Sequence, residues 1–118
     1  MQQISNQPQS GGQSRQIPEY LIGAPIEASQ LPSSWNDKDK CSLIALAKSN
    51  MKVIYNGPGK SDSEAATVRA NLPIPPQCGV FYYETTVISK GRDGYIAIGI
   101  CSGTTSLSRL PGWEANSW

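Results

Sequence analysis

Histidine is missing from this chain, and cysteine is scarce, with only Cys41, Cys78 and Cys101 present. Without histidine there is no Ser-His-Asp or Cys-His arrangement to activate a nucleophile, and a common zinc ligand is lacking. The three cysteines are widely spaced and form no Cys-x-x-Cys pair, which indicates reduced thiols in an intracellular protein. We therefore expect no catalytic residues, no metal and no cofactor.

Clustered charge of one sign and long apolar runs are lacking as well. Ten basic residues stand against nine acidic ones, giving a net charge of +1, and this balance argues against a nucleic-acid or anionic-membrane surface. Residues 1–20 contain no apolar signal region, and no apolar run approaches the ~18 residues that a membrane span needs. We expect no nucleic-acid partner, no membrane association and a cytoplasmic location, with the nucleus as a second compartment.

A phosphate-binding loop is also lacking. The string 57–61, Gly-Pro-Gly-Lys-Ser, resembles the end of such a loop, but Ile54 stands where the pattern requires its first glycine. The acidic residues are dispersed, and Glu84 is the one that we expect to be partly buried, since it lies among aromatics. We predict that Glu84 pairs with Arg69 or Arg92 and has a structural role.

What the chain does contain divides into three parts. Residues 1–18 hold almost nothing apolar besides Ile4 and Ile17, and such a composition cannot offset the entropy of ordering, so we predict a disordered Gln/Ser/Gly/Pro-rich tail. Residues 19–30 are predicted to be an extended arm. Residues 31–118 are the globular part.

The globular part is predicted to be all β. Short runs rich in β-branched and aromatic residues alternate with turn residues, a pattern typical of an antiparallel sandwich. The alternating charges of 37–40 indicate a solvated turn, and 61–66 one helical turn capped by Ser61. The predicted strands are 41–47, 51–56, 67–70, 80–89 and 95–101, of which the first two form a hairpin.

The last of these strands has two different faces. Ile96, Ile98 and Ile100 share one face and are predicted to lie in the core. The opposite face is small, which indicates that another segment approaches closely there: Ala97, Gly99 and Cys101.

The segment 31–118 resembles a SPRY domain, and within that family the RanBPM group. The most specific string is 88–99, Ile-Ser-Lys-Gly-Arg-Asp-Gly-Tyr-Ile-Ala-Ile-Gly. The other matching strings are 31–35, 68–71, 73–75, 78–84 and 109–113.

The resemblance implies an antiparallel sandwich of which this chain holds the N-terminal part, because a further strand follows the position of Trp118 in the family. It also implies a non-catalytic scaffold of a GID/CTLH-type ubiquitin-ligase complex. There the SPRY domain docks proteins or short peptides, such as ligase subunits or substrate receptors. Trp113 and Trp118 are then expected to be exposed, whereas Trp35 is expected to be a packing residue.

Loops at one end of the sandwich are the expected binding surface. SPRY domains of the SOCS-box type bind peptides through an Arg-x-Pro-x-Ala loop, whose positions resemble Asn56, Pro58 and Lys60 here. A later Tyr-x-x-Leu pair resembles Leu107 and Leu110. Only the proline and the second leucine match, so we expect a loop-built protein-binding surface without the acidic, Asn-rich peptide preference of that type.

Two other hypotheses stay open from the sequence. One is a β-sandwich enzyme acting on carbohydrate, suggested by dispersed carboxylates among aromatics. The other is a truncated gene product without independent function, suggested by the end at Trp118.

Overall fold

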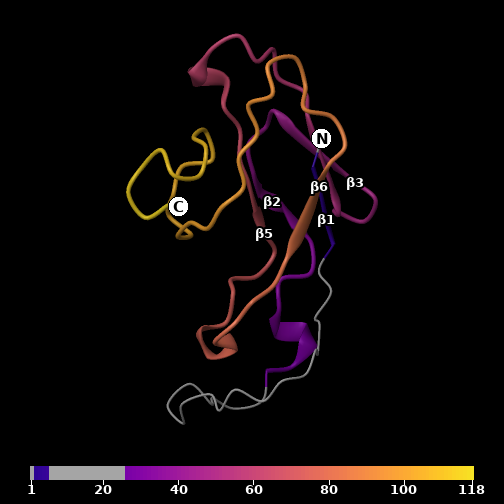
Figure 1. The fold of residues 1–118 in the computed structure, drawn as a ribbon, viewed down its shortest axis with the longest axis vertical. Coiled ribbons are helices and arrows are strands. Elements are labelled where there is room, and N and C mark those ends of the chain that lie inside the picture. The colour runs from indigo at the N-terminus through magenta and orange to yellow at the C-terminus, as the bar shows by residue number, and fades with distance from the viewer. Residues whose placement is uncertain (1, 6–25) are drawn as a thin grey trace.

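The computed structural model describes residues 2–5 and 26–118, and within them the chain is built from strands without any α-helix. A four-stranded sheet has the order β3-β4-β1-β6, and β2 and β5 form a second sheet, both antiparallel (Figure 1). This confirms the predicted all-β class. The strands are β1 (Gln2–Ser5), β2 (Trp35–Lys40), β3 (Ile44–Ala47), β4 (Lys52–Tyr55), β5 (Val68–Ala70) and β6 (Glu84–Val87).

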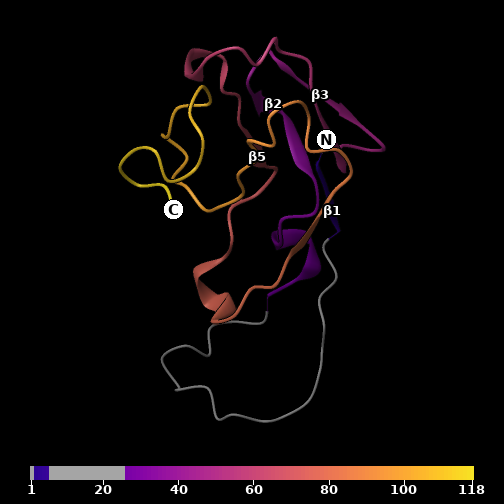
Figure 2. The ribbon, with the colours of Figure 1, turned by 45° about the horizontal axis from the view of Figure 1, so that its top comes forward.

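In the range 26–118, short 3-10 helices interrupt the strands: η2 (Ala28–Gln30), η3 (Asp62–Glu64) and η4 (Pro76–Cys78). The predicted helical turn near Ser61 is thus confirmed as η3, although Ser61 caps it without a side-chain hydrogen bond. Figure 1 and Figure 2 place η3 at the end of the molecule opposite η2 and η4. The loop after β4, which leads into η3, therefore lies at one end of the sheets.

The core is small and lies between the two sheets. Trp35 of β2, Ile44 of β3 and Val53 of β4 are buried, and Trp35 is only 9% exposed. This confirms Trp35 as a packing residue. Partly buried apolar residues from both sheets surround these three: Leu46, Ala66 and Val68.

The predicted hairpin forms between β3 and β4. Its turn, Lys48–Asn50, holds three successive residues in the left-handed region, with φ of 53°, 55° and 63°. That region costs about 1–2 kcal/mol for each residue with a Cβ. The turn is held from outside, because the backbone N–H of Trp35 donates to the carbonyl of Asn50 at 2.9 Å.

Glycine at the middle of this turn is expected to stabilise the protein. Ser49→Gly removes the Cβ clash at φ 55° and should raise the free energy of unfolding by about 0.5–1 kcal/mol after the entropic cost of glycine. The matched control is Ser42→Gly, where φ is not left-handed and glycine should lower stability by about 0.5–1 kcal/mol. Urea unfolding of both variants is the measurement, and shifts of the same sign would contradict the prediction.

The solvated turn predicted at 37–40 is wrong, because these residues belong to β2. Within its sheet β2 pairs with β5 alone, and the register shifts between Trp35 and Lys40. One edge of β2 is thus free of a strand partner in the described chain. A strand edge with alternating charges remains solvated and resists further pairing, which is why such a run is compatible with a strand.

The first residues of the predicted tail include strand β1, Gln2–Ser5, which lies between β4 and β6. Two facing strands offer backbone donors and acceptors that a segment of almost any sequence can satisfy. The rest of the predicted tail, 6–18, and residues 19–25 of the predicted arm lie outside the described residues. The end of that arm contains η2 rather than an extended chain.

The last two predicted strands are shorter than expected. Of 80–89 only Glu84–Val87 is a strand, and 95–101 contributes an isolated bridge between Cys101 and Ser117. Ile98 and Ile100 are 43% and 52% exposed rather than buried, so their prediction as core residues is wrong. Ile100 and Trp118 exchange both backbone hydrogen bonds at 2.8 Å, but this ladder is too short to make a strand.

The small face of the same segment behaves as predicted. A Cβ on Gly99 would overlap the carbonyl of Trp118 and lie 2.9 Å from Cβ of Pro111, so another segment does approach closely. Such close backbone approach is a usual reason for glycine in an extended segment. Trp113 and Trp118 are exposed, as expected.

Candidate protein-interaction surface

Arg69 of β5 connects the second sheet to the loop that carries the later predicted site residues. Its Nε and Nη2 donate to the two carboxylate oxygens of Asp39 at 2.7 and 2.9 Å, and Nη1 donates to the carbonyl of Thr105 at 2.6 Å. These hydrogen bonds hold the pKa of Asp39 below its usual range and raise the pKa of Arg69. Bidentate pairs are among the strongest charged contacts, so the pair with Asp39 orients the guanidinium, and its Nη1 then holds the loop at Thr105.

The two arginines expected beside Glu84 pair elsewhere, because Arg69 meets Asp39 and Arg92 pairs with Asp93 at 2.9 Å. Glu84 is exposed, and the hydroxyl of Tyr82 donates to it at 3.1 Å, which raises the pKa of Tyr82. Sequence reasoning missed Asp39 because it lay in the supposed turn.

The first predicted loop is exposed and held from two sides. The N–H of Lys60 donates to the carboxylate of Glu64 at 2.5 Å, and Nη2 of Arg92 donates to the carbonyl of Gly59 at 2.7 Å. The backbone is therefore fixed, whereas the side chains of the three predicted residues face solvent: Asn56, Pro58 and Lys60.

The second predicted loop is anchored through its backbone. The N–H of Thr67 donates to the carbonyl of Leu107 at 2.8 Å, and the hydroxyl of Thr67 donates to the carbonyl of Arg109 at 2.5 Å. Leu107 and Leu110 are both half-buried. The second loop is thus held by the segment that leads from η3 into β5, and the first by η3 and Arg92.

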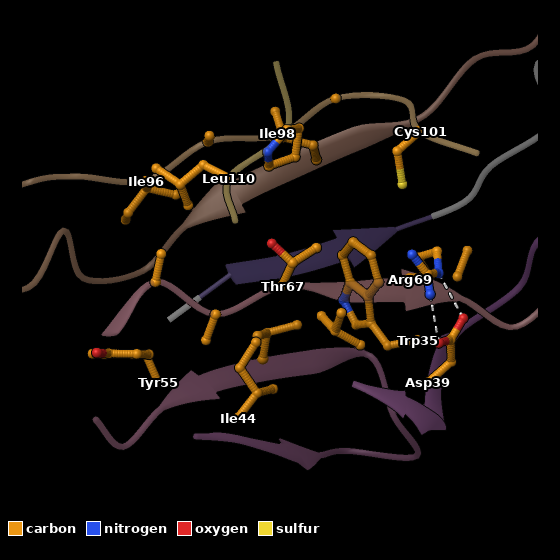
Figure 3. A pocket seen from close by; sticks show the side chains of 18 of the residues that line it. Trp35, Asp39, Ile44, Tyr55, Thr67, Arg69, Ile96, Ile98, Cys101 and Leu110 are labelled. Atoms are coloured by element: carbon orange, nitrogen blue, oxygen red, sulfur yellow. Dashed lines mark hydrogen bonds and ion pairs between the residues drawn. The ribbon is translucent and has the colours of Figure 1, made fainter. Parts of the chain in front are cut away.

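An open cavity of about 940 Å³ lies between the sheets and the segment 95–101 (Figure 3). In Figure 3, Ile96, Ile98 and Leu110 lie above it and Ile44 below it, with the indole of Trp35 between them. Its volume falls in the range of ordinary ligand sites. A largely apolar, open cavity of this kind can accept apolar side chains of a polypeptide.

The cavity brings together two of the five predicted site residues. Lys60 and Leu110 belong to its lining, whereas Asn56, Pro58 and Leu107 do not. One residue from each loop therefore lines the same cavity, and the other three predicted site residues lie outside its lining.

Sequence reasoning missed one contact on the second loop. The guanidinium of Arg109 lies 5.6 Å from the ring centre of Trp113, a cation–π distance, and both residues are exposed. Arginine and tryptophan are enriched among the residues that dominate binding at protein interfaces. The signal in the sequence was their spacing of four residues around Pro111 and Gly112, where the chain turns.

No family model matches the chain. Among curated proteins it is 51% identical over 87 residues to Ran-binding protein 9 of Xenopus tropicalis, a match that covers 74% of this chain and 16% of the relative. It is 42% identical over 116 residues to the Ran-binding proteins 9/10 homolog of Drosophila melanogaster, covering 97% of this chain and 12% of the relative. The chain is homologous to part of Ran-binding proteins 9 and 10.

The relationship reaches beyond animals and concerns a limited part of each relative. The Ran-binding protein M homolog of Arabidopsis thaliana is 30% identical over 92 residues, which cover 77% of this chain and 20% of the relative. The chain therefore spans a fifth or less of the length of these Ran-binding proteins. The relationship to the RanBPM group, which was predicted from the sequence, is confirmed.

The described residues hold neither a candidate membrane span nor a candidate metal site. No helix among them is both long and apolar enough to cross a bilayer. The same residues contain no group of three or more His, Cys, Asp or Glu side chains that could hold a metal ion.

Proposed function

We propose that residues 31–118 are the N-terminal part of a SPRY domain and that they serve as a non-catalytic protein-recognition module. The observation that carries the proposal is the pair of loops around Lys60 and Leu110, which meet at one open apolar cavity. Their backbones are held by Arg92 and Thr67. Rigid loops with exposed side chains are a common way to build a binding surface.

The partner is a protein or short peptide bound without a cofactor. An apolar side chain of that partner enters the cavity beside Leu110, and acidic groups meet Lys60 and Arg109 at its edge. The resemblance suggests subunits or substrate receptors of a GID/CTLH-type ubiquitin ligase, in the cytoplasm and nucleus. The relatives are named for Ran binding, so Ran is the first defined protein to test.

The enzyme hypothesis receives no support from the structure. It was suggested by dispersed carboxylates among aromatics, and Glu84, the one expected to be partly buried, is exposed.

The loop surface is tested by substituting it as a whole. A full-chain variant with Asn56, Pro58, Lys60 and Leu110 all changed to alanine is expected to capture purified Ran or purified ligase subunits at least about tenfold more weakly, since several contacts are removed together. The matched control changes the exposed Asp37 and Lys38 of β2 to alanine and should leave capture unchanged. Unaltered capture by the loop variant, with a normal urea midpoint, would sink the loop assignment.

A further inference from the structure

Two hydroxyl residues of the chain have an acidic residue three positions after them, and both are serines. Asp37 follows Ser34 in this way, and Glu64 follows Ser61, where Asp62 adds a second carboxylate directly after the serine. Protein kinases choose their substrates partly by the charge pattern around the acceptor residue, and a kinase with a basic substrate groove favours acidic side chains at these positions. The sequence therefore offers two phosphorylation sites of one type, and their surroundings in the structure differ.

Ser34 is enclosed by the fold. It is half-buried, its N–H donates to Oδ1 of Asn71 at 3.3 Å, and its carbonyl accepts from the N–H of Asn71 at 2.9 Å. The next residue, Trp35, begins β2 and belongs to the core. A kinase needs the residues after the acceptor as a free chain, so β2 would have to leave β5 and the core would have to open. Opening of core strands is among the costliest local unfolding events of a protein.

Ser61 lies in an open loop. The stretch 56–67 joins β4 to β5, holds only the short helix η3, and lies at one end of the molecule (Figure 1). Ser61 and Asp62 are both exposed. The hydroxyl of Ser61 shares a hydrogen bond with the exposed hydroxyl of Ser63 at 2.7 Å and makes no capping bond to the backbone of η3. Exposed segments without strand pairing open most easily, so this hydroxyl is accessible.

Glu64 is held close to Ser61 by contacts that a kinase can open. Its carboxylate accepts from the N–H of Lys60 at 2.5 Å, and its carbonyl accepts from the hydroxyl of Tyr55 at 2.7 Å. The carboxylate is therefore freed by breaking one hydrogen bond at the surface, without any change in the core. The structure thus separates two serines that the charge pattern alone treats alike.

From this difference we propose that Ser61 is a phosphorylation site for an acid-directed serine/threonine kinase. Oγ of Ser61 forms a bond to the γ-phosphorus of magnesium-bound ATP, the bond from that phosphorus to the β–γ bridging oxygen breaks, and ADP leaves. The catalytic aspartate of the kinase accepts the hydroxyl proton. The product is a phosphoserine with a charge of about −1.5 to −2 at neutral pH.

The new charge would lie at the loop surface. Ser61 and Lys60 both line the cavity, and Lys60 is where acidic groups of the partner are placed under the proposed function. The phosphate repels those groups and neutralises Lys60, so phosphorylation weakens capture of the partner. This consequence rests on the proposed function, whereas the phosphorylation site itself does not.

The first test is phosphorylation of the purified full chain by purified casein kinase 2 with magnesium and ATP. Mass spectrometry of fragments should place the phosphate at Ser61, with an initial rate at least about tenfold higher than at Ser34. Glu64→Gln keeps an oxygen for the N–H of Lys60 but removes the charge, and should lower the rate at least about tenfold. Ser63→Ala is the matched control and should leave the rate unchanged. No phosphate at Ser61, or an unchanged rate in Glu64→Gln, would overturn the proposal.

Peptides of residues 29–39 and 56–66 separate the effect of the fold from that of the sequence. Each carries its serine at the centre, and neither has β2 paired with β5. The preference for Ser61 over Ser34 should be at least about fivefold larger in the full chain than between the peptides, because only the full chain protects Ser34. Equal preferences would show that the fold does not select the site.

The effect on recognition is measured with the phosphorylated chain. Its capture of purified Ran or purified ligase subunits should be about three- to tenfold weaker than that of the unmodified chain, owing to like-charge repulsion. Ser61→Ala, treated with the same kinase, should capture like the unmodified chain. Equal capture by the phosphorylated and unmodified chains would refute the regulatory effect. A lack of capture by the unmodified chain would count against the proposed function and this effect together, and would leave the result for Ser61 standing.

Discussion

Trp35→Ala is expected to lower the free energy of unfolding by about 3–5 kcal/mol, the usual cost of removing a large buried aromatic side chain. Trp35 belongs to the buried core cluster with Ile44 and Val53, and it joins β2 to the hairpin of the other sheet. A core this small offers few other contacts to close the space. Cooperative unfolding in urea, followed by far-UV circular dichroism, should be lost or shifted far towards low denaturant.

The control for this prediction is Trp118→Ala, which removes the same side chain from a position that is 74% exposed. It should change stability by no more than about 0.5 kcal/mol. Trp35→Phe is informative as well, because Nε1 of Trp35 is buried without a hydrogen-bond partner in the described structure. Removing an unsatisfied donor offsets part of the lost packing, so phenylalanine should cost clearly less than alanine. Equal midpoints for Trp35→Ala and Trp118→Ala would refute the assigned core.

Arg69→Ala is expected to cost about 2–3 kcal/mol at neutral pH. It removes two hydrogen bonds to Asp39 and one to Thr105, and hydrogen bonds to charged groups contribute about 1.5–3 kcal/mol each. The sum is reduced because the side chain of Asp39 is 35% exposed and water screens the pair. Urea unfolding at pH 7 measures the loss.

The same pair predicts how stability depends on pH. The pKa of Asp39 is lowered in the folded state, so its stabilising contribution is complete above the unfolded value of about 3.9. It disappears as pH falls through the lower, folded value. Stability of the unchanged chain should therefore decline in this acidic range, and the decline should be smaller in Arg69→Ala. Asp37→Asn is the control, because Asp37 is 66% exposed and 3.9 Å from Lys40; a similar flattening there would argue against the assignment.

The parts of the fold that were predicted correctly are those with local signals. The hairpin around Lys48–Asn50 follows from two apolar runs and turn residues between them, and Trp35 was recognised as a packing residue. The strands at 37–40 and at Gln2–Ser5 were missed, because their side chains are polar and the partner strands that hold them are distant in the sequence. Isoleucines at 96–100 were assigned to the core because alternation indicates a buried face, but alternation does not say what covers that face.

For the candidate surface, too, some features were predicted from the sequence and others were seen only in the structure. The positions of its loops followed from the resemblance. Glycine and proline in these segments also mark them as loops. Which residues share the cavity, and that Asp39 rather than Glu84 meets Arg69, depended on how the sheets are placed.

By itself, the sequence determined the all-β class and the relationship to RanBPM proteins, because composition and matched strings are local properties of the chain. Only the tertiary structure decided the pairing of Asp39 with Arg69 and the meeting of Lys60 and Leu110 at one cavity. These contacts join residues far apart in the chain, and strand register, which no local pattern of side chains specifies for a polar segment, determines them.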